Sequence, residues 1–246
     1  LTELLTEFGK IDLLWFDGVW ERTSEQWKFK EMREYIRKLS PETVVNERIG
    51  EYGDYACPEQ GVPIIPPEGP WELCMTLNDS WGHNANDNNY KSLRQIVKIF
   101  TECIGAGGNL LLDIGPKPDG SIREEDEKFL ISLGEWIEPR KEAIYETVRG
   151  LPLGHYYGPS TLSEDKKTLY LFYFEKPIDE IQIKGLITPV KRVTVVGDES
   201  NTELKHNRGL GFLAIPGITY IELPEKVTND VCTVIKVELE DEIEIY

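Results

Sequence analysis

The sequence predicts a mixed α/β region followed by an all-β region, and two observations support this prediction. Up to about residue 150, short apolar runs alternate with segments of helical periodicity, which is typical of a parallel sheet covered by helices. Beyond Gly150, short strand-like runs are separated by turn residues, at a spacing typical of an antiparallel sandwich or barrel. We therefore expect two domains, residues 1–148 and residues 149–246.

The first domain contains four apolar runs and three helical segments. Parallel strands are expected at residues 11–16, 43–48, 71–77 and 109–115. Helices are expected at about residues 23–39, 91–104 and 123–145. Glycines after the second helix (Gly105, Gly107 and Gly108) predict its end. At the third helix, Ser121 and Glu124 have the spacing of a capping box.

Four β/α units are consistent with two architectures. They can form a small open sheet, or they can be half of an eight-stranded barrel, which needs ~250 residues when it is whole. A chain of 246 residues cannot hold a whole barrel and a β domain of this size. The barrel interpretation therefore predicts only the last four β/α units of a (β/α)8-like barrel.

The sequence of the second domain predicts a series of short strands. They are expected at residues 168–174, 180–185, 190–196, 209–217, 219–224, 232–239 and 242–246. Together they predict one small antiparallel β-sandwich.

The charge balance excludes several classes of partner. With 27 basic and 44 acidic residues the net charge is −17, which argues against nucleic acid and against a polybasic membrane surface. No apolar run approaches the ~18–20 residues that a membrane-spanning helix needs. The four cysteines form no CxxC pair, so we expect buried thiols rather than a structural zinc site or a disulfide scaffold. We expect no metal and no cofactor.

Polar and aromatic side chains follow the predicted parallel strands, where the functional residues of such folds gather. Asp17 comes directly after the apolar run that ends in Trp15 and Phe16, although an acid there can also cap a helix or open a turn. Arg48 follows the second run, where an ordinary surface residue is equally compatible with the pattern.

Three further candidates lie on the loops beyond. Glu59 and Glu72 belong to a proline-rich stretch, residues 51–72, and long irregular loops in compact domains are often functional. Trp81 stands among small polar residues, where a platform for a sugar ring and a lid on the local core are both possible. The glycine-rich stretch 105–120 fits neither phosphate-binding template. Carboxylates and tryptophans at strand ends suit glycoside hydrolysis, which uses one carboxylate as nucleophile and one carboxylic acid as proton donor.

Four ordered motifs resemble one known family. IDLLWFDG, NERxGxxGDYxxPEQ, WELCMTLNDSWGHN and GGNLLLDIGPKPDG are similar to the second half of the catalytic domain of the α-L-fucosidases, glycoside hydrolase family 29. The resemblance covers roughly residues 1–147, and the β domain resembles the C-terminal sandwich of that family less specifically. It implies retaining hydrolysis of terminal α-L-fucose from fucosylated glycans.

The resemblance also implies roles for individual residues. Asp17 corresponds to the nucleophile, and Glu59, 42 residues later, to the acid/base, with Glu72 as the rival for that role. We favour Glu59 because it lies in the loop, whereas Glu72 is expected at a strand start, away from the catalytic end. Trp15, Arg48 and Trp81 are expected in the fucose pocket, with Arg48 holding Asp17 ionised.

The sequence departs from the family in one respect. Residues that the family carries in the first half of the barrel have no counterpart here. We therefore expect this chain alone to be an incomplete fragment that binds fucose weakly, or to pair with a separate N-terminal half of the barrel. Two alternatives stay open: a non-catalytic carbohydrate-binding or interaction protein that uses the β domain, and another retaining glycosidase.

Overall fold

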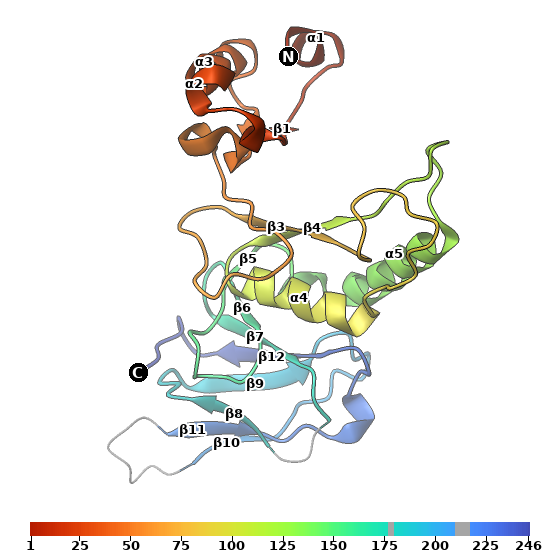
Figure 1. The fold of residues 1–246 in the computed structure, drawn as a ribbon. Coiled ribbons are helices and arrows are strands. Elements are labelled where there is room, and N and C mark those ends of the chain that lie inside the picture. The colour runs from red at the N-terminus through yellow and green to blue at the C-terminus, as the bar shows by residue number, and fades with distance from the viewer. Residues whose placement is uncertain (177–179, 210–216) are drawn as a thin grey trace. The chain divides into compact units, whose positions relative to one another are not determined.

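A computed structural model of the chain describes residues 1–176, 180–209 and 217–246. The chain forms two compact units, Leu1–Cys74 and Met75–Tyr246. Figure 1 follows their elements from the N-terminus in red to the C-terminus in blue. A mixed α/β region precedes antiparallel sheets, as the sequence predicts. The expected domain boundary at 148/149 stays a prediction.

The first unit begins with helices around a short parallel strand pair. Its elements are α1 (Thr2–Glu7), β1 (Leu13–Leu14), α2 (Ser24–Trp27), α3 (Phe29–Leu39) and β2 (Val44–Val45), with 3-10 helices at Val19–Glu21 and Glu47–Tyr52. β1 and β2 pair in parallel, with Leu13 opposite Val44. Both strands lie inside the predicted runs, and they are shorter than expected because the chain leaves the ladder after two residue pairs.

The helical segment of the first unit is interrupted. α2 starts with a capping box between Thr23 and Gln26, and it ends at Lys28, whose φ of 58° lies in the left-handed region. The predicted helix at 23–39 is therefore two helices. Residues from α1, α3, β1, β2 and the 3-10 helix Glu47–Tyr52 form the core of this unit: Leu5, Leu14, Phe29, Ile36, Val45 and Ile49.

The second unit begins with strands and two long helices. β3 (Glu72–Thr76) starts in the first unit and continues into the second, where it pairs with β4 (Asn109–Asp113). α4 (Leu93–Gly105) follows a capping box between Ser92 and Gln95. Beyond its end Gly107 adopts a φ of 82°, and Gly108 donates its N–H to the carbonyl of Cys103. The prediction that glycines end this helix is confirmed.

The capping box predicted at the next helix is wrong. α5 (Glu124–Ile137) has Arg123 at its N-cap, without a side-chain cap. The Ser121 hydroxyl instead donates to the carboxylate of Asp119, two residues earlier, so it is engaged in the preceding turn. A 3-10 helix, Glu138–Ala143, continues α5 to nearly the predicted end at residue 145.

The rest of the second unit consists of antiparallel strands in two sheets. They are β5 (Thr147–Arg149), β6 (Ser160–Ser163), β7 (Thr168–Tyr173), β8 (Ile181–Lys184), β9 (Val190–Val195), β10 (His206–Arg208), β11 (Ile218–Ile221) and β12 (Thr233–Leu239). The order is β5-β6-β7-β12-β9 in the larger sheet and β10-β11-β8 in the smaller.

The predicted strands of this region agree with the structure in five of seven cases: 168–174, 180–185, 190–196, 219–224 and 232–239. The expected strand at 209–217 lies almost wholly outside the described residues. The run at 242–246 forms only an isolated bridge between Ile245 and Leu186. The sequence pattern missed β6 because its polar residues are buried. The hydroxyl of Thr161, for example, donates to the carbonyl of Ala143.

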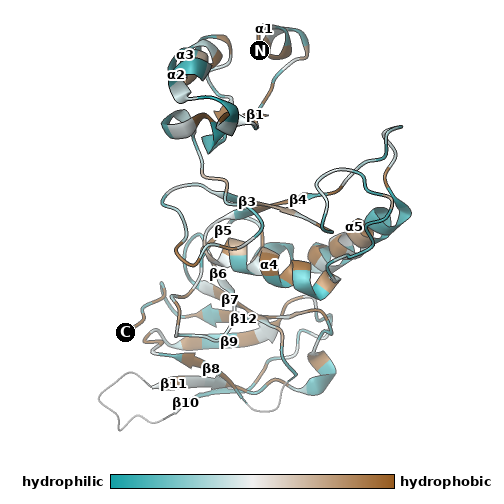
Figure 2. Cartoon of the chain, in the orientation of Figure 1, coloured by the Kyte–Doolittle hydropathy of each residue, from teal (hydrophilic) through white to brown (hydrophobic). Residues whose placement is uncertain are grey.

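β7 is buried on both faces, and this organises the second unit. Leu169 and Leu171 point into a core shared with β8, β9, β11 and β12. The alternating residues Tyr170 and Phe172 point the other way, into a core shared with α4 and α5. Figure 2 shows the corresponding alternation of apolar and hydrophilic residues along α4. The larger sheet therefore joins the helices to the smaller sheet.

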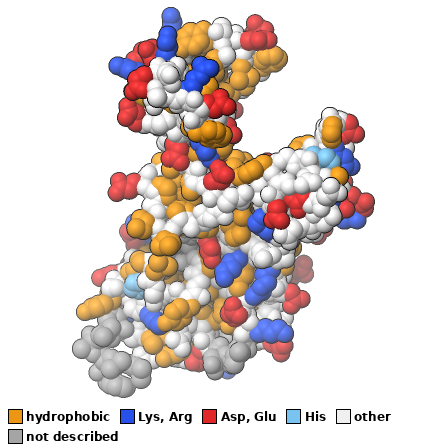
Figure 3. Space-filling view, viewed as in Figure 1, with side chains coloured by type: hydrophobic (Ala, Val, Ile, Leu, Met, Phe, Trp, Pro, Cys, Tyr) orange, Lys and Arg blue, Asp and Glu red, His pale blue; other side chains and the backbone are white. Residues whose placement is uncertain are grey.

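The surface carries charges of both signs. On the face seen in Figure 3, acidic side chains alternate with basic ones. All four cysteines are buried. Within the described parts of the chain, no helix is both long and apolar enough to cross a bilayer.

We expect Phe172→Ala to lower the free energy of unfolding by about 3–5 kcal/mol, because it leaves a cavity between the larger sheet and the helices. Leu153→Ala is the control, because Leu153 is 95% exposed and its removal changes stability by no more than about 0.5 kcal/mol. Urea denaturation of the two variants measures the difference, and equal losses would contradict the two-sided burial of β7.

Candidate active site

Asp17 stands at the carboxyl end of β1, and the backbone before it is tightly held. The fully buried side-chain amide of Asn46 accepts the backbone N–H of Phe16 at 2.8 Å and donates to the carbonyl of Phe16 at 2.9 Å. Gly18 follows Asp17 with a φ of 80°, so the chain turns away directly after the carboxylate. Asp17 itself is exposed, as a group that must reach a ligand has to be.

The loop after β2 is anchored at both of its ends. The Asp54 carboxylate accepts the backbone N–H of Val45 at 2.8 Å and forms ion pairs with Arg33 and Arg37 of α3. The Glu47 carboxylate accepts the backbone N–H of Cys57 at 2.7 Å. This part of the predicted irregular loop is therefore a fixed structure.

A segment at residues 55–59 continues the parallel pattern of the first unit. Tyr55 forms a parallel bridge with Asn46 on one side, and Ala56 forms one with Trp71 on the other. Further along the segment, Glu59 bridges Cys74. These bridges place the start of β3 level with the carboxyl end of β2.

Arg48 connects two of the predicted site residues. Its guanidinium lies 5.2 Å from the centre of the Trp15 ring, in a cation–π contact. Its Nη2 donates to Oε2 of Glu59 at 2.7 Å. The Arg48 side chain is 19% exposed and that of Glu59 is 43% exposed, so the pair lies at the rim of the site. We expected Arg48 beside Asp17, whereas its ion pair in the described structure is with Glu59.

Glu72 is the first residue of β3, at a strand start as predicted, and its neighbours include Trp15 and Tyr55. Its carboxylate faces the indole of Trp15 and the hydroxyl of Tyr55, although neither group makes a hydrogen bond of ordinary geometry within the described residues. Burial raises the pKa of Glu72, and these two neighbours only partly offset the shift. The reason for its position is the register of the parallel segments, in which Trp71 pairs with Ala56.

The thiol of Cys57 lies near the side chains of Asn46 and Arg48. The thiol accepts a long hydrogen bond of 3.8 Å from Nδ2 of Asn46. Burial raises its pKa, against the opposing influence of Arg48. The thiol is therefore protonated near neutral pH and is a poor nucleophile.

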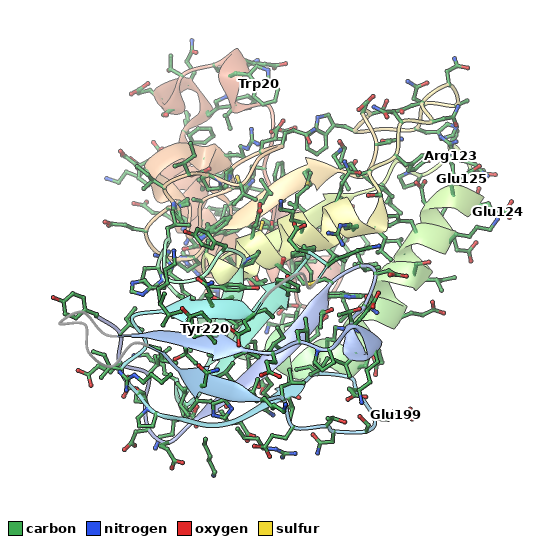
Figure 4. All side chains as sticks on the ribbon, turned by 90° about the horizontal axis from the view of Figure 1, so that it is seen from below. Trp20, Arg123, Glu124, Glu125, Glu199 and Tyr220 are labelled. Carbon is green, nitrogen blue, oxygen red and sulfur yellow. The ribbon has the colours of Figure 1, made fainter. Side chains whose placement is uncertain are left out.

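Trp81 belongs to the second unit, where it is 42% exposed on the loop after β3. The loop is organised by the carboxylate of Asp87, which accepts from the Ser80 hydroxyl at 2.7 Å and from the backbone N–H of Asp79 at 3.0 Å. Arg123, labelled in Figure 4, donates to the carbonyl of Asp87 at 2.8 Å. The loop that carries Trp81 is thus held by hydrogen bonds within its own unit.

The first unit therefore brings together Trp15, Arg48, Glu59 and Glu72, with Asp17 two residues beyond Trp15. Sequence reasoning missed Asn46 as a structural contact, because nothing in the motif shows that its side chain reaches residue 16. It also missed Trp20, which is 70% exposed three residues after Asp17 (Figure 4). No group of three His, Cys, Asp or Glu side chains that could hold a metal ion occurs in the described ranges.

Comparisons with known proteins identify the family. The sequence profile described as Alpha-L-fucosidase matches residues 1–142, which is more than half of the chain. The chain belongs to the α-L-fucosidase family. The family resemblance of the four motifs is thereby confirmed, and the relatives extend the likeness beyond residue 142.

Two relatives show how much of a fucosidase the chain represents. It is 30% identical to plasma α-L-fucosidase of Rattus norvegicus over 242 residues, covering 91% of this chain and 51% of the rat protein. The structure of α-L-fucosidase isoenzyme 1 from Paenibacillus thiaminolyticus matches with a TM-score of 0.84 at 32% identity, covering 97% of this chain and 60% of that one. The chain thus spans about half the length of the rat relative and three fifths of the bacterial one.

A third relative has a bound ligand. A GH29 α-L-fucosidase from Bacteroides thetaiotaomicron is described as a trapped covalent intermediate in complex with 2-fluoro-fucosyl fluoride, in a Glu→Gln mutant. Its TM-score is 0.83 at 18% identity, covering 97% of this chain and 59% of that chain. At this identity the likeness shows the fold alone.

For this fucosidase-family chain we expect Glu72→Gln to increase stability at neutral pH. Because burial raises the pKa of Glu72, the folded state holds the proton more tightly than the unfolded chain. Stability is therefore lost as the pH rises from the usual carboxyl range through the raised pKa, and Gln removes that loss.

Urea midpoints of the unmodified chain and the variant, measured between pH 4 and pH 8, test this. The midpoints should converge at the acid end and separate towards pH 7. Glu68→Gln, at an exposed loop position, is the control and should show no such separation. A gain for Glu72→Gln that does not vary with pH would show that the carboxyl is not desolvated.

Proposed function

We propose that the protein is a retaining α-L-fucosidase that removes terminal α-L-fucose from fucosylated glycans by double displacement. The observation that supports this most is family membership combined with an exposed carboxylate, Asp17, at the strand end where Trp15, Arg48 and Glu59 also lie. The covalent intermediate of the Bacteroides relative is what double displacement requires in that protein, and we infer the same course here.

The finer architecture is part of the proposal. Residues 1–148 would form the last four β/α units of a (β/α)8-like barrel, and residues 149–246 a β-sandwich. The likeness to the Paenibacillus enzyme over 97% of the chain supports this interpretation. In such a barrel the carboxyl ends of the strands carry the active site, and Asp17 and Arg48 follow β1 and β2 directly.

In the first displacement, a carboxylate oxygen of Asp17 attacks the anomeric carbon of fucose and forms an ester. Glu59 donates a proton to the departing glycosidic oxygen, so that the leaving sugar departs as an alcohol. In the second displacement, Glu59 takes a proton from water, whose oxygen attacks the same carbon and releases Asp17. Asp17 keeps no proton at any stage, because a protonated carboxyl is a poor nucleophile.

Arg48 would change partners during this cycle. In the structure it is bound to Glu59, and a carboxylate held in an ion pair cannot donate a proton. We infer that hydroxyl groups of bound fucose take up the donors of Arg48, and that Glu59, freed from the ion pair, takes a proton from solvent before it acts as the acid. Trp15, whose ring centre lies 5.2 Å from the Arg48 guanidinium, would present its ring to the sugar. Trp81, exposed on the second unit, stays a proposed sugar contact.

Glu72 is the rival proton donor. Its raised pKa suits a group that must be protonated before the first displacement. Its burial beside Trp15 and Tyr55 opposes the role, because a proton donor has to reach the leaving oxygen. Glu59, at the exposed rim, has that access, and we therefore assign it as the acid/base.

We expect Asp17→Asn to abolish hydrolysis of an aryl α-L-fucoside, with a loss on the order of 10³-fold or more in kcat, because the nucleophile is gone. The assay uses the protein at its natural length, with calorimetry to show that fucose still binds. Loss of turnover with retained binding supports the hydrolase. Unchanged behaviour of the variant would favour a carbohydrate-binding role through the β domain. A panel of other aryl glycosides distinguishes the fucosidase from another retaining glycosidase.

The acid/base assignment predicts a dependence on the leaving group. Glu59→Gln should slow cleavage of a fucosylated disaccharide by roughly 10²–10⁴-fold, because an alkoxide leaves poorly without a proton. It should slow the first step on a fucoside with an acidic phenol far less. Glu72→Gln is the matched variant and should show no such dependence. The opposite pattern in the two variants would assign the acid/base role to Glu72.

A further inference from the structure

Asn46 makes contacts that the catalytic roles proposed above do not use. It is fully buried, and each polar group of its side chain has a partner. Oδ1 accepts the N–H of Phe16, while Nδ2 donates to the carbonyl of Phe16 and to the sulfur of Cys57. Because every contact matches the polarity of its atom, the amide can take only one orientation.

These contacts continue the strand ladder by a side chain. The backbone N–H of Asn46 donates to the carbonyl of Leu14 at 3.3 Å, which is the last backbone hydrogen bond from β2 to β1. Two residues after Leu14, the backbone N–H and carbonyl of Phe16 form hydrogen bonds with the side-chain amide of Asn46 rather than with the backbone of β2. The pairing is thereby extended from Leu14 to Phe16.

The carbonyl of Phe16 is part of the peptide group that also contains the nitrogen of Asp17. A peptide group is planar, so fixing its oxygen fixes the plane that leads into Asp17. On the other side Gly18 turns the chain away with a φ of 80°. The Asn46 amide is thus the contact that sets the direction in which the Asp17 carboxylate leaves the strand.

We propose that Asn46 is a positioning residue for the nucleophile, acting through the peptide group between Phe16 and Asp17. This inference rests on the proposed function, since it requires Asp17 to attack the sugar. Attack is sensitive to small displacements, and a shift of about 1 Å can cost on the order of 10²-fold in rate. The Asn46 amide holds the two peptide groups on either side of Phe16, one hydrogen bond to each, and this opposes such a shift.

The alternative is that Asn46 only holds two strands together, and the chain contains a matched residue for that role. Thr43 is also fully buried and also joins the same two segments, because its hydroxyl donates to the carbonyl of Ile11 at 2.7 Å. It lies at the amino end of the strand pair, whereas Asn46 lies at the carboxyl end. Loss of either contact should lower stability, and only loss of Asn46 should affect Asp17.

The reaction with 2-fluoro-fucosyl fluoride isolates the step in question. An oxygen of Asp17 forms a bond to the anomeric carbon, the carbon–fluorine bond breaks, and fluoride leaves with the bonding electrons. Fluoride needs no proton to depart, so the rate reports the nucleophile without Glu59. Intact mass measures the adduct, and dependence on reagent concentration separates binding from attack.

We expect Asn46→Ala to lower the maximal rate of adduct formation at least about tenfold, with little change in the reagent concentration for half-maximal rate. Thr43→Ala, compared at a temperature where both variants are folded, should stay within about twofold of the unmodified protein. Asn46→Asp is the second variant. It keeps the size of the side chain and loses the donor to the Phe16 carbonyl, so its rate should fall as well.

The outcomes separate the inference from the function on which it rests. If the unmodified protein at its natural length forms an adduct on Asp17 and the Asn46 variants react like Thr43→Ala, then Asn46 only stabilises the strand pair. The inference is then overturned. If the unmodified protein forms no adduct, or forms it on another residue, then the proposed function itself fails.

Discussion

The parallel register of the first unit is the constraint on which the candidate site depends. β1 pairs with β2, Asn46 bridges Tyr55, and Ala56 bridges Trp71, all in the same direction. Side chains that are up to 57 residues apart in sequence, from Trp15 to Glu72, are therefore brought to one level of the structure. Hydrogen bonds between backbones set this arrangement, and a slip of one residue would turn every side chain to the opposite face. The positions of the candidate carboxylates depend on a register that their own motifs do not encode.

The carboxylates of the site differ in how far they are buried and in whether a cation lies beside them. The chain carries a net charge of −17, and only a few of its carboxylates lie near Arg48. The guanidinium packs on Trp15 and pairs with Glu59, while Glu72 is partly buried near Trp15 and Tyr55. A carboxyl that loses water without gaining a cation has its pKa raised, as at Glu72. Glu59, at the rim, has the Arg48 guanidinium beside it. Two chemically identical side chains are thus given different properties by their surroundings.

Much of the fold was predictable from patterns that depend on neighbouring residues. The four apolar runs of the first region and the run at 168–174 each contain a strand, because alternation or continuity of apolar residues reports burial directly. β6 escaped prediction because its buried hydroxyls are satisfied by partners distant in sequence, such as the carbonyl of Ala143 for Thr161. The cap expected from Ser121 is absent because the Ser121 hydroxyl donates to the nearby carboxylate of Asp119. A local pattern predicts which hydrogen bonds a residue can form, and the partners that the fold brings near decide which of them it forms.

The sequence by itself determined the family, the candidate carboxylates and the order of strands and helices, because motifs and periodicity are properties of neighbouring residues. Only the tertiary structure decided which of these residues meet. It paired Arg48 with Glu59, and it placed Glu72 near Trp15. It also showed the Asn46 amide holding the peptide that precedes Asp17. Such contacts arise when distant segments pack in a particular register, and the free energy of that packing is shared among many residues rather than stored in any one motif.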